Sequence, residues 1–121
     1  MRIVPKEKFY GYPCSYVGVG CAYEDIYKKP FDEDLSEDAR NDGYLTLDGA
    51  NKYLRKYIPV RKKDYYKRNE RMLLCDFLQD NTEKCLVCVL GHFVYVCGQD
   101  YYSFFRNEND PVVCVWYIKE Q

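Results

Sequence analysis

A cysteine and a histidine are the residues of this chain best suited to nucleophilic chemistry. His92 is the single histidine among 121 residues, and it stands at the head of the apolar run 93–96. Cys14 lies far upstream, directly after Pro13, where a helix is expected to begin. A free thiol is mostly protonated at neutral pH, and both a helix N-terminus and a neighbouring imidazolium favour the thiolate. The two residues therefore predict a nucleophile, Cys14, with a general base, His92.

A third group is needed to orient the imidazole through its other ring nitrogen. A turn at Gly98-Gln99-Asp100 would send the following strand, residues 101–106, back alongside residues 92–97. The end of that returning strand comes level with His92, and Asn107 stands there with Asp110 close behind. Strand pairing therefore predicts Asn107, or else Asp110, as the orienting residue.

Other roles for these residues stay open. His92 also fits a packed strand residue, and Cys21 is a rival nucleophile, although it lies two turns into the expected helix, where the dipole effect has faded. Cys85-x-x-Cys88 with His92 suggests part of a zinc site, whose second pair would have to be Cys14 and Cys21. Alternation along an apolar strand would point Cys85 and Cys88 to opposite faces. We therefore expect no metal and no cofactor.

Helical patterns dominate the first half of the chain. The first expected helix spans 14–27, with Val17 and Cys21 turned inward, and close packing of a neighbour would compensate for Gly18 and Gly20. Two more helices are expected, one over 47–57 capped by Thr46 and one capped by Asn69 and ending near 80–81. Residues 60–66 suggest a short, charged edge strand.

The pattern then changes to β-branched and aromatic runs at 85–90, 92–97, 101–106 and 112–118, separated by turn residues. Helices followed by an antiparallel meander indicate an α+β fold, with N-terminal helices packed on a C-terminal antiparallel sheet. The length fits a single domain of residues 1–121.

The composition and charge limit the classes of partner that we expect. The net charge is −1, which gives no overall attraction to nucleic acid or anionic membrane. The 14 tyrosines and the basic stretch 52–71 would suit stacking and phosphate contacts, but we expect no nucleic-acid partner. No run of about 18 apolar residues indicates a membrane span. Seven cysteines without a leading signal peptide favour a reducing, cytoplasmic setting.

The order of these features resembles the papain-like cysteine peptidase fold. The features are a cysteine at a helix start, a helical middle, the motif Gly-His-Phe-Val-Tyr-Val at 91–96, a hairpin, and Asn or Asp-Pro at its end. The chain is most similar to the compact bacterial branch that includes the bacteriocin leader-processing peptidases. Residues 42–50 are similar to the second helix of that branch, and residues 71–78 and 85–89 to the helix and strand before the histidine.

The resemblance implies a cysteine peptidase, or a related thiol acyl hydrolase or deamidase, acting on a peptide or protein substrate. Cys14 would be the nucleophile, His92 the base and Asn107, or Asp110, the orienter. Lys8 stands where the family has a glutamine of the oxyanion hole, and Ser15 where a glycine is frequent. Lys8 and Ser15 are therefore candidate residues of the oxyanion hole or pocket.

Tyr12 is a further candidate for the oxyanion hole or pocket. The alternative function is a catalytically inactive papain-like module that binds a partner protein, as in a small phage or mobile-element protein. A Cys14 Sγ within about 4 Å of a His92 nitrogen would favour the enzyme. A gap filled by Tyr10, Tyr12 or Lys8 would favour the binder.

Overall fold

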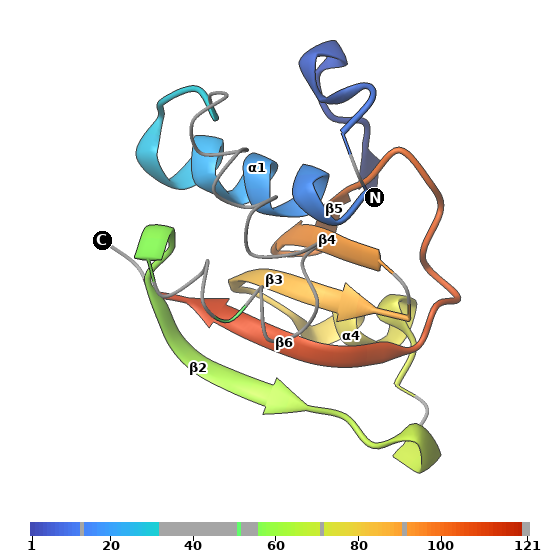
Figure 1. Ribbon diagram of the computed structural model, residues 1–121. Helices are drawn as coiled ribbons and strands as arrows, with labels where there is room; N and C mark the ends of the chain where they lie inside the picture. Colours follow the sequence, from blue (N-terminus) through green and yellow to red (C-terminus); the bar gives the residue numbers. More distant parts are fainter. Residues whose placement is uncertain (13, 32–50, 52–55, 71, 91, 120–121) are drawn as a thin grey trace.

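The protein is a six-stranded sheet with helices, as seen in a computed structural model that describes residues 1–12, 14–31, 51, 56–70, 72–90 and 92–119 (Figure 1). The predicted α+β class is confirmed. The strand order is β1-β5-β4-β3-β6-β2. The elements are β1 (Arg2–Ile3), η1 (Glu7–Phe9), α1 (Cys14–Tyr27), β2 (Val60–Tyr65), η2 (Arg68–Glu70), α4 (Leu74–Asp80), β3 (Lys84–Val89), β4 (His92–Cys97), β5 (Asp100–Tyr102) and β6 (Val112–Ile118).

Helix α1 has the bounds that the sequence pattern predicts. A Cβ added at Gly18 would lie 2.8 Å from the carbonyl oxygen of Phe93 in β4, and one at Gly20 would lie 2.5 Å from the ring of Phe9. The two glycines therefore serve close packing, as expected. The helix ends at Tyr27, and Lys28 follows in the left-handed region with φ 55°.

The strands after residue 84 form the predicted β3-β4-β5 meander, but the last strand does not continue it. β6 pairs with β3, and β5 instead takes the short N-terminal strand β1 as a parallel neighbour. The sheet is therefore mixed rather than purely antiparallel. The expected strand 101–106 is also too long, because β5 ends at Tyr102, where the Ser103 hydroxyl accepts the N–H of Phe105 and bends the chain.

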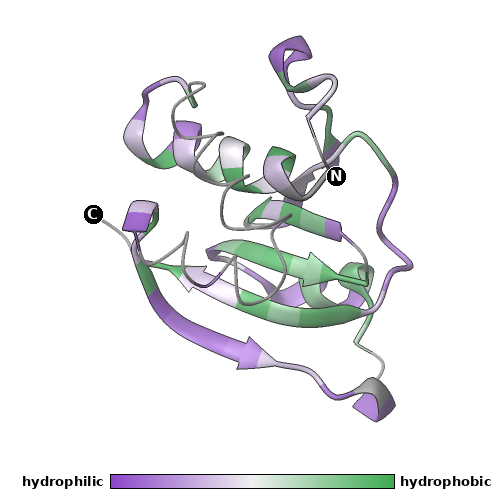
Figure 2. Cartoon of the chain, in the orientation of Figure 1, coloured by the Kyte–Doolittle hydropathy of each residue, from purple (hydrophilic) through white to green (hydrophobic). Residues whose placement is uncertain are grey.

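The edge strand β2 agrees with the sequence prediction, whereas the start of helix α4 does not. β2 is the edge strand that its charges suggest, and it is coloured hydrophilic in Figure 2. Helix α4 begins after Leu73 rather than at Asn69, which lies in η2. The start is set by tertiary contacts, since the N–H groups of Leu74 and Cys75 donate to carbonyls of the loop before β6.

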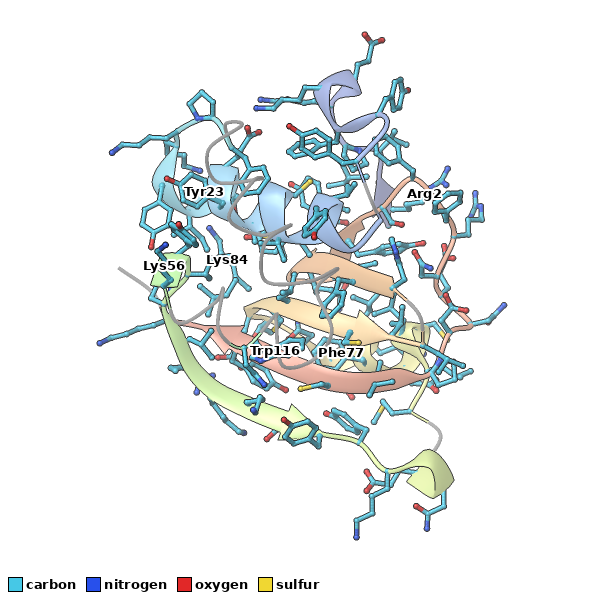
Figure 3. All side chains as sticks on the ribbon, viewed as in Figure 1. Arg2, Tyr23, Lys56, Phe77, Lys84 and Trp116 are labelled. Carbon is cyan, nitrogen blue, oxygen red and sulfur yellow. The ribbon has the colours of Figure 1, made fainter. Side chains whose placement is uncertain are left out.

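Both faces of the sheet are apolar. One cluster joins α1 to residues such as Leu86, Cys88 and Trp116, and the other joins α4 to residues such as Cys85 and Val87. Trp116 and Phe77, labelled in Figure 3, belong to the first and second cluster respectively. The predicted alternation of Cys85 and Cys88 is therefore confirmed, and the two thiols do not form one ligand pair.

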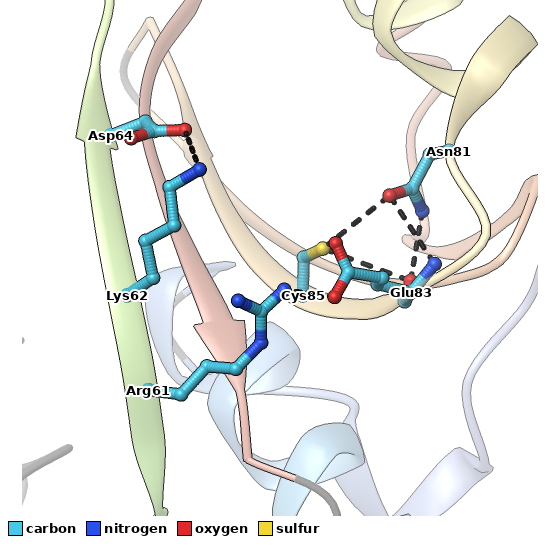
Figure 4. A network of polar contacts seen from close by, with 6 residues as sticks. All are labelled: Arg61, Lys62, Asp64, Asn81, Glu83 and Cys85. Atoms are coloured by element: carbon cyan, nitrogen blue, oxygen red, sulfur yellow. Dashed lines mark hydrogen bonds and ion pairs between the residues drawn. The ribbon is translucent and has the colours of Figure 1, made fainter.

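Polar contacts account for the Cys85 thiol. Its sulfur lies 3.7 Å from Oδ1 of Asn81 and 3.7 Å from the carbonyl oxygen of Glu83 (Figure 4). Asn81 in turn donates to the carbonyls of Glu83 and Gly98, at 2.8 and 2.6 Å. This thiol therefore belongs to the network that closes the turn between α4 and β3.

Parts of the expected pattern lie outside the described residues. They include the acidic stretch and most of the expected helix 47–57, of which Asn51, Lys56 and Tyr57 are described and are helical. Within the described part of the chain, no helix is long and apolar enough to cross a membrane.

Candidate functional site

His92 lines a cavity of about 290 Å³ between the N-terminal segment and the loop that follows β5. The wall is largely aromatic, and its other members include Phe9, Tyr10, Tyr12, Val17, Phe104 and Phe105. Tyr10 and Phe105 are 63% and 56% exposed, so both stand at the mouth of the cavity. The sequence predicted Tyr12 as a pocket residue, and it lies in this wall.

Helix α1 reaches the same cavity through its first turns. Val17 lines it, and the neighbouring Gly18 allows the helix to approach the carbonyl of Phe93, the residue after His92. Cys14 is the first residue of α1, one helical turn before Gly18, or about 6 Å along the axis. The side chains of Cys14 and Ser15 lie outside the described residues, so the sulfur–nitrogen distance stays a prediction.

A chain of hydrogen bonds leads away from the imidazole. His92 Nε2 lies 3.2 Å from Ser103 Oγ, and the Ser103 hydroxyl donates to Asn107 Oδ1 at 2.7 Å. Asn107 Nδ2 donates to Asp110 Oδ2 at 2.7 Å. The two predicted orienting residues therefore stand in one network with His92, but Ser103 lies between them and the ring.

The loop that carries this network is held by backbone contacts. Leu74 N–H donates to the Asp110 carbonyl at 3.0 Å, and Cys75 N–H donates to the Glu108 carbonyl at 2.9 Å. Asn107 N–H also donates to the Tyr101 hydroxyl, at 3.3 Å. The start of α4 thus uses its otherwise unpaired donors to fix the loop that holds Asn107 and Asp110.

Burial controls the protonation of His92. Loss of solvent around the ring lowers its pKa, and the nearby charge of Asp110 raises it only in part, so the net direction is downward. Phe105 packs edge-on against the imidazole, with 6.2 Å between the ring centroids. The imidazole is therefore neutral at neutral pH, the form that can accept a proton.

Lys8 is engaged elsewhere. Its ammonium lies 2.5 Å from Oε2 of Glu24, in the third turn of α1, and 5.5 Å from the centroid of the Phe9 ring. Among the described contacts, none brings Lys8 to His92. The expectation that Lys8 takes the place of the missing glutamine therefore finds no support in these contacts.

Cys21 is a buried thiol in the core cluster of α1. Burial first, and then the charge of Glu24, raise its pKa to about 12, against the weaker opposing effect of Lys6 and Lys8. A thiol of this kind is a poor nucleophile at neutral pH. The structure thus favours packing over reactivity for the rival of Cys14.

Ser103 is the site residue that sequence reasoning missed. It is 1% exposed and lies in Tyr101-Tyr102-Ser103-Phe104-Phe105, where it is the one small hydroxyl in an aromatic run. That contrast was the available signal. The expected strand 101–106 runs straight through this position, whereas β5 ends at Tyr102.

No group of three or more metal-ligating side chains gathers among the described residues. Comparison of the chain with protein-family models, with curated protein sequences and with solved structures gave no match.

Proposed function

We propose that the protein is a papain-like thiol hydrolase, a cysteine peptidase or a related acyl hydrolase or deamidase, with Cys14 as nucleophile and His92 as base. The observation that carries the proposal is the shared cavity of His92 and the first turns of α1. Positions 14, 17 and 18 share one helix face by their spacing. Val17 lines the cavity, and Gly18 packs against the backbone of β4.

In the proposed reaction, the Cys14 thiol gives its proton to Nδ1 of His92, and the sulfur forms a bond to the substrate carbonyl carbon. The carbonyl electron pair moves to oxygen, where backbone N–H groups of the first turn of α1 would stabilise the negative charge. Collapse of this intermediate expels the amine, which takes the proton back from His92. Water then hydrolyses the thioester and restores the thiol.

The shape of the cavity suits an extended peptide. Its walls are aromatic and open to solvent at Tyr10 and Phe105, and none of its lining side chains carries a carboxylate, an ammonium or a guanidinium group. A flexible segment can enter such a cleft, whereas the small chain offers little area for a large folded substrate.

A second candidate function is a catalytically silent module that binds a partner protein. Lys8 favours it, because the residue at the position of the expected oxyanion-hole amide pairs with Glu24 instead. The exposed aromatic rings at the cavity mouth would serve a binder as well as an enzyme.

Alkylation of the thiols by iodoacetamide tests the proposal. We expect Cys14 to react about tenfold faster at neutral pH than Cys75, a half-buried thiol outside the site, because the neutral His92 can take the thiol proton as the sulfur attacks. His92→Gln should remove this advantage and leave the rate at Cys75 unchanged. Site-resolved mass spectrometry of the full chain gives both rates.

Incubation with a peptide library supplies the second readout. New peptide termini that appear with the wild type and not with Cys14→Ser would support hydrolysis. A Cys14 that reacts no faster than Cys75, with no effect of His92→Gln, would contradict the catalytic pair. Fast labelling with neither a cleaved nor a deamidated peptide would favour the binding module.

A further inference from the structure

We propose that Ser103 is a positioning residue which, with Asn107 and Asp110, fixes His92 as the Nε2–H tautomer and leaves Nδ1 as its basic nitrogen. The catalytic consequence rests on the proposed function, whereas the tautomer itself does not. Each hydrogen bond of this network can run in one direction only, and these directions fix the tautomer of His92.

Asp110 sets the direction at the far end. An ionised carboxylate only accepts hydrogen bonds, so the Asn107 atom that lies 2.7 Å from its Oδ2 must be the amide nitrogen. The amide oxygen of Asn107 then necessarily points to Ser103. Because an amide oxygen only accepts, the Ser103 hydroxyl must donate its single proton to it, at 2.7 Å.

Ser103 passes this direction on to the imidazole. A serine hydroxyl has one donor and two acceptor sites. The donor is spent on Asn107, and one acceptor site receives the N–H of Phe105 at 3.1 Å. The remaining site faces His92 Nε2 at 3.2 Å, and it is satisfied only if Nε2 carries the hydrogen. A neutral ring that is protonated at Nε2 has its lone pair on Nδ1.

The network is placed to hold this arrangement. Ser103 and Asn107 are only 1% and 5% exposed, so solvent is largely kept from the two central groups. The backbone of the loop is tied to α4 through the Asp110 and Glu108 carbonyls. A buried hydroxyl with all of its sites filled has no alternative partner to which it can turn.

The consequence for catalysis is a base that is ready before substrate arrives. A ring that carried its proton on Nδ1 would present no lone pair there for the thiol. In the proposed reaction, Ser103 touches neither substrate nor the reacting atoms, and it acts only through His92.

Nitrogen NMR of the histidine-labelled full chain tests the tautomer directly. Because His92 is the single histidine, its ring signals need no residue assignment, and their long-range couplings to the ring C–H protons tell Nδ1 from Nε2. At about pH 8, where a histidine is neutral, we expect Nε2 at the shift of a protonated nitrogen and Nδ1 at that of an unprotonated one. A protonated Nδ1 in the wild-type chain would overturn the inference, whatever the variants do.

Asn107→Leu supplies a sharper test, with Asn109→Leu on the exposed neighbour as matched control. Without the amide oxygen, the Ser103 hydroxyl is free to donate to Nε2, and the ring should shift towards the Nδ1–H tautomer. The control should keep the wild-type spectrum. An unchanged tautomer in a folded Asn107→Leu chain would contradict the proposal, and if that variant does not fold, the wild-type spectrum decides alone.

Ser103→Ala tests the link between the tautomer and the proposed reaction. We expect this variant to weaken the Nε2–H preference of His92 and to slow alkylation of Cys14 several-fold.

The tautomer and the proposed function can fail independently. A wild-type Cys14 rate that does not depend on His92 would defeat the proposed function and leave the tautomer result standing. A rate that depends on His92 in a chain with the opposite tautomer would defeat the inference alone.

Discussion

The surroundings of His92 in the fold determine the protonation of its imidazole ring. Burial lowers its pKa, and the charge of Asp110 only partly offsets that effect. The ring therefore acts as a neutral base in the proposed reaction and not as a standing imidazolium partner of the thiolate. In our proposal, the polar network through Ser103 also decides which ring nitrogen carries the hydrogen.

The lowered pKa of His92 has a measurable effect on stability. The unfolded chain has an ordinary histidine pKa of about 6.5, so on acidification it takes up the proton before the folded chain does. The contribution of His92 to the free energy of unfolding is therefore constant above that pH. It falls as the pH drops through about 6.5, and levels off below the folded pKa.

Urea unfolding of the wild type and of His92→Gln, followed by fluorescence of the buried Trp116, measures this contribution. As the pH falls through this range, we expect the unfolding free energy of the wild type to decrease relative to that of His92→Gln. Parallel pH profiles for the two chains would show that the histidine pKa is not lowered.

At the scale of the elements, the site depends on how closely α1 approaches β4. Gly18 lets the helix backbone lie against the Phe93 carbonyl, next to His92. Asp25 ties the other end of the helix to the sheet, since it accepts the Tyr95 hydroxyl at 2.5 Å and pairs with Lys84 of β3 at 3.1 Å. The helix is thus held at two points along its length.

Gly18→Ala should destabilise the protein even though alanine favours helices. The helix gains about 1 kcal/mol from the substitution. The new Cβ would meet a backbone oxygen at 2.8 Å, which cannot turn away, and overpacking of this kind costs roughly 1–3 kcal/mol. We expect a net loss in urea unfolding and slower alkylation of Cys14.

Gly20→Ala is the comparison variant, because its Cβ would meet the buried rings of Phe9, at 2.5 Å, and of Phe31, at 3.1 Å, and not the backbone of β4. It should also lose stability in urea unfolding. A Gly18→Ala chain as stable as the wild type would show that α1 and β4 are not in close contact.

For the whole molecule, the buried cysteines report on both faces of the sheet. Burial is the first cause that raises their pKa values, to about 12 for Cys21, Cys85 and Cys114 and to about 11 for Cys88. Cys21, Cys88 and Cys114 lie in the cluster of α1, and Cys85 in the cluster of α4. One sheet joins the two clusters, so they are expected to unfold together.

Alkylation of these four thiols should therefore follow global unfolding. In increasing urea, we expect all four to become reactive at one midpoint, the same as that of Trp116 fluorescence, as for one cooperative domain. Site-resolved mass spectrometry after brief labelling gives the four curves. Separate midpoints for Cys85 and the other three would contradict the prediction of a single domain.

Much of the local structure was predictable because its signals are local. The bounds of α1, β4 and β6 agree with those expected, since helical spacing, a preceding proline and β-branched runs are visible in short windows. The edge position of β2 followed from its charges. The pairing of β6 with β3, the parallel strand β1 and the start of α4 did not follow, because each depends on partners distant in the chain.

The candidate site divides in the same way. The sequence by itself determined the chemistry on offer: one histidine at a strand start, a cysteine at a helix start, and amide and carboxylate groups beyond a hairpin. Only the tertiary structure decided that Ser103 stands between His92 and Asn107, and that Lys8 belongs to Glu24. The physical reason is that periodicity orients side chains within one element, whereas a hydrogen-bond partner is chosen by the packing of several.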